Sequence, residues 1–114
     1  MDLDWLRSVC LQWPGTSEDI KWGNDLCFLV AGKMFCASNM EQPFRIAFKV
    51  PDEEFEELSQ RDGFIPAPYM ARAKWVMVES VNKLSKKEWK EFLEQSYKLV
   101  RAKLPKKIQK ELGG

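Results

Sequence analysis

The residues best suited to chemistry in this sequence are aromatic rings that stand beside lysine and arginine. They follow the prolines of Pro66-Ala67-Pro68 within one short segment: Tyr69, Arg72, Lys74 and Trp75. Rings can stack on nucleobases while cations neutralise phosphates, so this segment is a candidate nucleic-acid contact. The competing interpretation is that both rings belong to the hydrophobic core and both cations are simply solvated.

A second set of cations recurs at the three- and four-residue spacing of one helix face. Its members are Lys87, Lys90, Lys98 and Arg101, and the positive end is extended by Lys83 and Lys86. Such a face can lie against phosphates, but the helix lacks the Asn/Gln/Arg triplet typical of a recognition helix, so we expect no base-specific readout. Glu94 interrupts the stripe and can pair with Lys98, which is typical of an ordinary solvated face.

The third candidate is the outward face of the segment 44–50. Phe44, Ile46, Phe48 and Val50 alternate with polar residues, which predicts a strand with Arg45 and Lys49 on its other side. An uncovered face there would form a concave platform for a ligand or another chain. The alternative is an exposed sheet face with normal polar residues.

Charge is distributed unevenly along the chain. The net charge is only +1, but residues 83–114 carry +6 and residues 1–82 carry −5. This asymmetry suggests an anionic partner. Lysines also complement helix C-termini and keep surfaces soluble, and this second explanation remains open.

Several classes of chemistry are excluded or disfavoured by composition. The chain has no histidine, which excludes His-dependent catalysis and every His-containing metal site. The three cysteines, Cys10, Cys27 and Cys36, have no close pairing, which argues against disulfides and structural zinc. No phosphate-binding glycine loop or nucleophile elbow is present. We therefore expect a protein that is not an enzyme and that has no metal and no cofactor.

The pattern of apolar and turn residues predicts one α+β domain over residues 1–114. In the first half of the chain we expect a helix over 3–13, a short strand within 16–25, a hairpin of 26–30 with 34–37 and the strand 44–50. A short helix from Asp52, an edge strand or loop at 64–69 and a strand over 75–79 should follow. A long helix then begins with a capping box of Ser85 and Glu88. The order is helix, about three strands, helix, about two strands, helix. This order is typical of a two-layer sandwich with an antiparallel sheet of about five strands and helices on one side. Residues 105–114 should form a short C-terminal helix or a tail.

The sequence carries no sign of a membrane segment. No apolar run approaches the roughly 20 residues of a spanning helix. The acidic start, Met1-Asp2-Leu3-Asp4, lacks the basic and apolar regions of a secretory signal. We expect a cytoplasmic protein.

Taken together, the residues resemble the MmcQ/YjbR family of small bacterial proteins. The likeness is carried by segments in a fixed order: Trp13-Pro14-Gly15, Trp22-Gly23, Gly32-Lys33-Met34-Phe35, Phe48-Lys49-Val50-Pro51, Pro66-Ala67-Pro68-Tyr69, Lys74-Trp75-Val76 and Ser96-Tyr97-Lys98-Leu99-Val100. The resemblance implies a fold similar to that of type III secretion chaperones, and the family is commonly labelled DNA-binding. Members often carry a histidine near the hairpin or in the late loop, and no role for such a histidine transfers to this chain.

Residues and resemblance together lead to one functional hypothesis and one alternative. The hypothesis is weak, sequence-nonspecific DNA binding by a basic surface composed of Tyr69, Arg72, Lys74, Lys86, Lys87, Lys90 and Lys98. The alternative is a protein-interaction module, chaperone-like or homodimerising, because seven Phe, five Trp and two Tyr are many rings for one small core.

Overall fold

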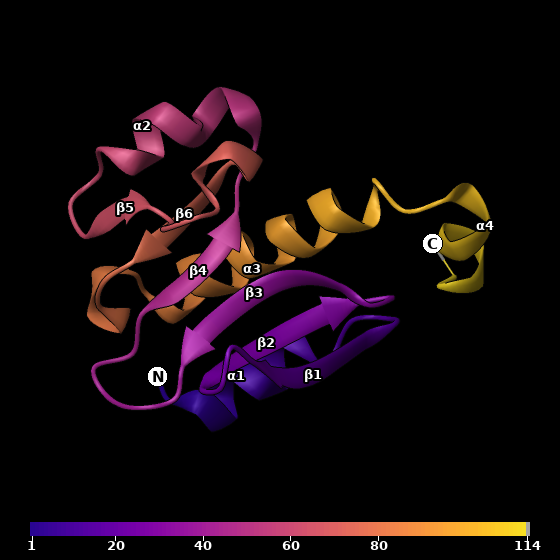
Figure 1. The fold of residues 1–114 in the computed structure, drawn as a ribbon, viewed down its shortest axis with the longest axis horizontal. Coiled ribbons are helices and arrows are strands. Elements are labelled where there is room, and N and C mark those ends of the chain that lie inside the picture. Colours follow the sequence, from indigo (N-terminus) through magenta and orange to yellow (C-terminus); the bar gives the residue numbers. More distant parts are fainter. Residues whose placement is uncertain (114) are drawn as a thin grey trace.

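A single antiparallel sheet of six strands forms one layer of the molecule (Figure 1). The computed structural model describes residues 1–113 of the chain. The strands are β1 (Thr16–Lys21), β2 (Asp25–Val30), β3 (Lys33–Asn39), β4 (Ile46–Lys49), β5 (Phe64–Pro66) and β6 (Trp75–Val78). Their order across the sheet is β1-β2-β3-β4-β6-β5. After β4 the chain passes to the edge to form β5, and it then returns to form β6 between β4 and β5.

Helices form the second layer. They are α1 (Leu3–Cys10), α2 (Phe55–Ser59), α3 (Lys86–Arg101) and α4 (Lys106–Glu111), with short 3₁₀ turns η1 (Asp52–Glu54), η2 (Ala71–Ala73) and η3 (Val81–Lys83). In Figure 1, α1 and α3 lie behind the sheet and α2 lies beside β5 and β6. The predicted α+β class is therefore confirmed.

The sheet contains one strand more than the sequence predicts. Four strands precede α2 instead of about three, since β1, the hairpin of β2 and β3, and β4 all pair in one ladder. β1 is an edge strand with four consecutive exposed residues, Ser17 to Ile20. As expected from its prolines, β5 forms the other edge.

The hydrophobic core lies between the sheet and the layer of α1 and α3. Fully buried rings of the sheet, Phe28, Phe35 and Phe48, pack in one cluster with Trp89 and Leu93 of α3. The ring of Phe48 lies 6.0 Å from that of Trp89, edge to face. Because alternate residues of a strand point to opposite faces, this packing leaves the other face of β3, β4 and β6 without a helix in residues 1–113 (Figure 1).

The two ends of α3 follow the expected signals. Ser85 accepts a hydrogen bond from Glu88 N, and the Glu88 carboxylate accepts one from Ser85 N, which forms the predicted capping box. After Pro105 the chain forms α4, whose Ile108 packs on the core, so residues 106–111 are a helix and not a tail. Among the described residues, no helix has the length and apolar character needed to cross a membrane.

Candidate functional site

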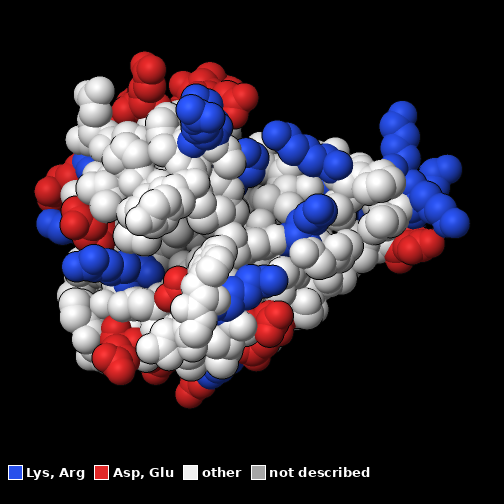
Figure 2. All heavy atoms as spheres, viewed as in Figure 1, with Lys and Arg blue, Asp and Glu red and all other residues white. Residues whose placement is uncertain are grey.

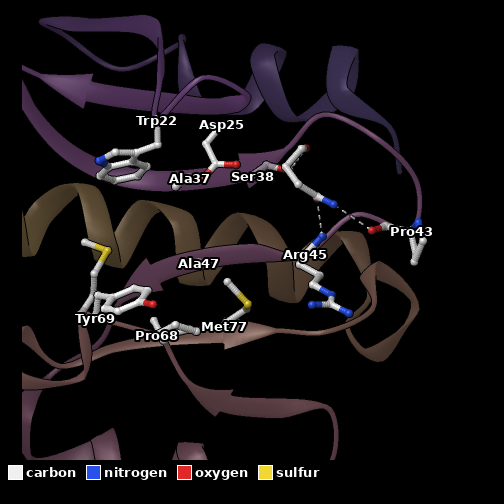
Figure 3. Close-up of a pocket in the computed structure, with 13 residues that line it drawn as sticks. Trp22, Asp25, Ala37, Ser38, Pro43, Arg45, Ala47, Pro68, Tyr69 and Met77 are labelled. Atoms are coloured by element: carbon white, nitrogen blue, oxygen red, sulfur yellow. Dashed lines mark hydrogen bonds between the residues drawn. The ribbon is translucent and has the colours of Figure 1, made fainter.

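A hollow of about 690 Å³ lies on the uncovered face of the sheet (Figure 3). We call it the open-face groove. Its walls and floor come from β2, β3, β4, β6 and three connecting segments. The lining residues are Trp22, Asp25, Ala37, Ser38, Asn39, Pro43, Arg45, Ala47, Ala67, Pro68, Tyr69, Met70 and Met77. The third sequence candidate is therefore concave, as that hypothesis requires.

Two exposed rings form the lips at one end of this groove. Trp22 is 68% exposed in the turn after β1, and Tyr69 is 106% exposed in the loop after β5. Both residues have positive φ, 52° for Trp22 and 65° for Tyr69. Left-handed backbone at a bulky residue is strained. These turns therefore hold large apolar groups in water at a cost to the folded state.

Small residues form the floor. Ala37 and Ala47 face each other in the register of β3 and β4, and Met77 pairs with Ala47 on β6. Because alanine ends at Cβ, this stretch of sheet lies deeper than its surroundings. The groove is consequently an apolar hollow with flexible thioethers at its side.

Charged side chains stand at separate places around the rim. Arg45 lies at the end opposite the two rings, and Asp25 lies beside Trp22 (Figure 3). The backbone N–H of Arg45 donates to Asn39 Oδ1 at 2.8 Å, and Asn39 Nδ2 donates to Pro43 O at 3.1 Å. Asn39 thereby fixes the loop that carries Arg45.

Two lysines lie beside the η2 turn, and the charge of a third acts on one of them. Lys49 of β4 is only 8% exposed, and its Nζ donates to Ala73 O. Burial lowers the pKa of Lys49, and the positive charges of Lys103 and Lys74 lower it further, while Asp52 opposes them. Sequence alternation predicts Lys49 on the polar face of the strand, but the η2 turn lies against it there and its side chain is buried. Lys49, Lys74 and Lys103, which we call the lysine cluster, come from three separate segments.

The sequence-predicted residues divide among three places. Tyr69 lines the open-face groove, whereas Arg72 is exposed in η2 and Lys74 follows it with Nζ 5.0 Å from the Phe55 ring centre. Trp75 is buried, so the core interpretation holds for Trp75 and not for Tyr69.

The helix lysines lie on α3, which packs on the covered face. Lys86, Lys87 and Lys90 belong to its first turns, and Lys86 Nζ lies 5.5 Å from the Trp5 ring centre. Lys98 lies near the other end, shares a shallow hollow with Pro51, and has Nζ 3.9 Å from Glu94 Oε1. Of the predicted cations, only Lys74 therefore belongs to the lysine cluster; Arg72 lies two residues before it, and the other lysines lie along α3.

Figure 2 shows how charge is arranged on the face that carries the groove. Acidic side chains gather over α2 at the top, and basic ones gather at the C-terminal end on the right. The centre of this face is largely uncharged. Cations also lie beside α2, where Lys74 Nζ is 5.0 Å from the Phe55 ring centre, so the two signs of charge are only partly separated on this face.

Two contributors to these sites are absent from the sequence candidates. Trp22 is not among the predicted site residues, although a tryptophan inside the turn-forming Trp22-Gly23-Asn24-Asp25 has no apolar stripe to join. Lys103 carries no local signal, because its neighbours Lys49 and Lys74 are distant in sequence.

The cysteines supply no ready nucleophile. Cys10, Cys27 and Cys36 are all buried and unpaired in the described chain. Burial is the main cause that raises the pKa of Cys27 to about 11 and raises that of Cys36. The Cys27 and Cys36 thiols are therefore protonated near neutral pH.

Comparison with known proteins identifies the family. The YjbR family model matches residues 11–99. The crystal structure of protein DR2400 of Deinococcus radiodurans, a DUF419 domain, is 31% identical with a TM-score of 0.88, over 98% of this chain and 88% of that one. A Pseudomonas syringae protein solved as a structural genomics target has 21% identity and a TM-score of 0.72, over 87% of this chain and 98% of that one, and shares the fold. A search of curated proteins finds no match.

The family model covers most of the chain, and the Deinococcus protein agrees with it over nearly the whole length. The resemblance inferred from the order of the sequence segments is therefore confirmed. This chain belongs to the YjbR family.

Proposed function

We propose that this protein is a non-enzymatic, nucleic-acid-binding protein that contacts the phosphate backbone weakly and without reading sequence. The observation that carries the proposal is that distant segments place lysines together. Lys49 Nζ donates to Ala73 O and Val50 N donates to Lys74 O, and the positive charge of Lys103 also acts on Lys49. Burial is the main cause that lowers the pKa of Lys49, and the charges of Lys103 and Lys74 add to it. Like charges repel one another, so an anion beside these lysines would be stabilising.

The surroundings of the cluster support a polyanion as its partner. Within residues 1–113, none of these three lysines forms an ion pair with a carboxylate. Arg72 is exposed in η2, two residues before Lys74, and adds a further cation on this segment. A phosphate backbone would neutralise several of these charges at once and release counterions.

Binding of this kind has a characteristic salt dependence. Each phosphate contact contributes about −0.9 to the slope of log K against log salt concentration on duplex DNA. Three to five contacts therefore make the affinity fall by roughly 40- to 500-fold between 50 and 200 mM salt. Because no set of base-reading side chains accompanies the lysines, affinities for unrelated sequences should agree closely.

Two double variants with the same change in charge test the proposal. Lys74→Glu/Lys103→Glu alters the lysine cluster, and Lys87→Glu/Lys90→Glu alters the first turns of α3. Fluorescence anisotropy with labelled duplex and single-stranded oligonucleotides should show a loss of about tenfold or more for the first variant. The second variant should lose only about two- to threefold, through the change in net charge.

Equal losses in the two variants would mean that net charge alone governs binding. A larger loss in Lys87→Glu/Lys90→Glu would move the interface to the start of α3. No binding by the wild type at low salt would reject a nucleic-acid partner.

The alternative role, a protein-interaction module, is favoured by the exposed rings of Trp22 and Tyr69. It predicts association that is insensitive to salt, and a dimer that light scattering detects. These two measurements separate the alternative from electrostatic binding.

A further inference from the structure

The open-face groove has the dimensions of a small-molecule site. Its volume of about 690 Å³ lies inside the range of roughly 300 to 1,000 Å³ that is usual for ligand pockets. Its lining is mostly apolar, with a few polar groups at the rim, which is also the usual composition of such pockets.

The two rings at the lips are free to stack on a guest. Ring pairs in residues 1–113 join residues of the covered face, such as Trp13 with Tyr97 and Phe48 with Phe92, and none includes Trp22 or Tyr69. Their turns follow the two edge strands, β1 and β5, so that the rings approach the groove from opposite sides (Figure 3). The strained turns hold the unstacked rings of Trp22 and Tyr69 over an apolar hollow. A flat ligand group that stacks on both rings would explain this arrangement.

The charged residues at the rim favour one orientation of a charged ligand in the groove. Arg45 has no ion-pair partner in the part of the chain that the structure describes, and it stands at the end opposite the rings. Asp25 stands beside Trp22 and repels an anion at that end. A ligand with an anionic group is therefore oriented with that group toward Arg45.

We propose that the open-face groove binds a small, flat aromatic molecule that carries one anionic group. The aromatic group lies between Trp22 and Tyr69, and its carboxylate or phosphate pairs with the Arg45 guanidinium, which binds either anion. This site shares no residue with the lysine cluster, so the two proposals stand or fall separately.

An extended peptide fits this groove less well. Peptides that add to a sheet bind through main-chain hydrogen bonds at an exposed strand edge. The groove lies over β3, β4 and β6, whose backbone groups are already paired with one another in register. The two free edges of the sheet, on β1 and β5, lie outside its floor.

The test uses four probes that separate the flat ring from the charge. They are 2-naphthoate and 2-naphthyl phosphate, which are flat anions, 2-naphthylmethanol, which is flat and neutral, and cyclohexanecarboxylate, which is an anion without a flat ring. Each is titrated into ¹⁵N-labelled protein, and the indole N–H signal of Trp22 is followed by NMR after its assignment from Trp22→Leu. Both flat anions should shift this signal saturably, and the tighter of the two identifies the preferred anion.

Variants assign the two halves of the site. Tyr69→Ala and Trp22→Leu should each weaken 2-naphthoate about tenfold, since stacking on one ring is of that order. Arg45→Gln should weaken 2-naphthoate about tenfold and leave 2-naphthylmethanol within twofold. Leu11→Ala, which removes an exposed apolar side chain from the end of α1, is the matched control and should change nothing.

Three results would overturn the assignment. The first is an unchanged Trp22 signal with both flat anions. The second is equal affinity for 2-naphthoate and cyclohexanecarboxylate. The third is a Trp22 signal that shifts with protein concentration alone, which would identify a second copy of the chain as the occupant.

Discussion

Ser96 is the residue at which α3 is joined to two strands of the sheet. It is fully buried, its Oγ donates to Phe35 O at 2.6 Å, and the same oxygen accepts from Lys49 N at 2.9 Å. Phe35 lies on β3 and Lys49 ends β4. One hydroxyl therefore satisfies a buried acceptor and a buried donor that the ladder leaves unpaired.

Removing this hydroxyl should lower the stability of the protein considerably, although only one atom is lost. Ser96→Ala leaves Phe35 O and Lys49 N–H without a partner, and we expect the free energy of unfolding to fall by about 1 to 3 kcal/mol. Urea denaturation followed by circular dichroism measures it. Ser8→Ala on exposed α1 is the control and should stay within about 0.5 kcal/mol of the wild type. A Ser96→Ala variant as stable as that control would show that water replaces the hydroxyl.

Cys27 makes stability depend on alkaline pH. Its side chain is fully buried, and burial together with Asp25 raises its pKa from 9.0 to about 11. The folded state then keeps a proton that the unfolded chain releases, so this contribution is complete below pH 9 and is lost as pH rises toward 11. Unfolding free energies from pH 8 to 11 should decline less in Cys27→Ala than in the wild type, by about 2 kcal/mol. Parallel profiles would mean that the Cys27 thiol titrates normally in the folded protein.

At the scale of single elements, the turn between β2 and β3 sets the register of the hairpin that contributes Ala37 to the groove floor. Val30 pairs with Lys33, so the turn consists of Ala31 and Gly32, with φ of 48° and 82°. Positive φ at both positions is the requirement of a type I′ hairpin, which favours Asn followed by Gly. Gly32 meets the requirement and Ala31 does not.

This turn can be improved by one substitution. Ala31→Asn should stabilise the protein by about 0.5 to 1 kcal/mol, because asparagine tolerates left-handed backbone better than alanine. Ala31→Val should destabilise it by about 1 kcal/mol or more for the opposite reason. Thermal unfolding of both variants gives the comparison. The same sign for both changes would contradict the role assigned to φ.

The elements also show how far sequence reasoning reaches. Alternation at 44–50, the capping box at Ser85 and Glu88, and the prolines that place β5 at an edge are local signals, and each was interpreted correctly. Lys49 was placed on an exposed face because alternation reports two faces but not what covers them. The exposure of Trp22 and Tyr69 depends on backbone angles in turns, which residue type does not reveal for aromatic side chains.

The sites depend on the arrangement of the whole chain. β6 inserts between β4 and β5, and only this crossover brings Lys74 beside Lys49 and places Met77 on the groove floor. Local patterns predict that strands exist, but pairing between distant strands is decided by packing. For this reason the sequence predicts which lysines and arginines are candidates for binding, but it does not predict which of them lie together in the folded protein.

The two ends of the chain meet through Gly15 and α4. Gly15 has φ of 76°, and a Cβ added there would overlap the side chain of Leu112. Gly15→Ala should therefore cost about 2 kcal/mol of stability, part from left-handed backbone and part from this overlap. In a Leu112→Ala background only the backbone part remains, and the cost should fall to about 1 kcal/mol. A double-mutant cycle in urea measures the difference, and identical costs in both backgrounds would show that α4 does not hold its place against Gly15.

The position of α3 near the end of the sequence has a consequence for biosynthesis. A ribosome adds about 5 to 20 residues per second, so the forty residues that separate Lys49 from Trp89 take about 2 to 8 seconds to emerge. During that interval the nascent hairpin of β2 and β3 and its neighbour β4 have no partner for Phe28, Phe35 and Phe48. We expect the growing polypeptide to depend on ribosome-associated holdases at this stage, and slower translation between β4 and α3 to lower the yield of native protein.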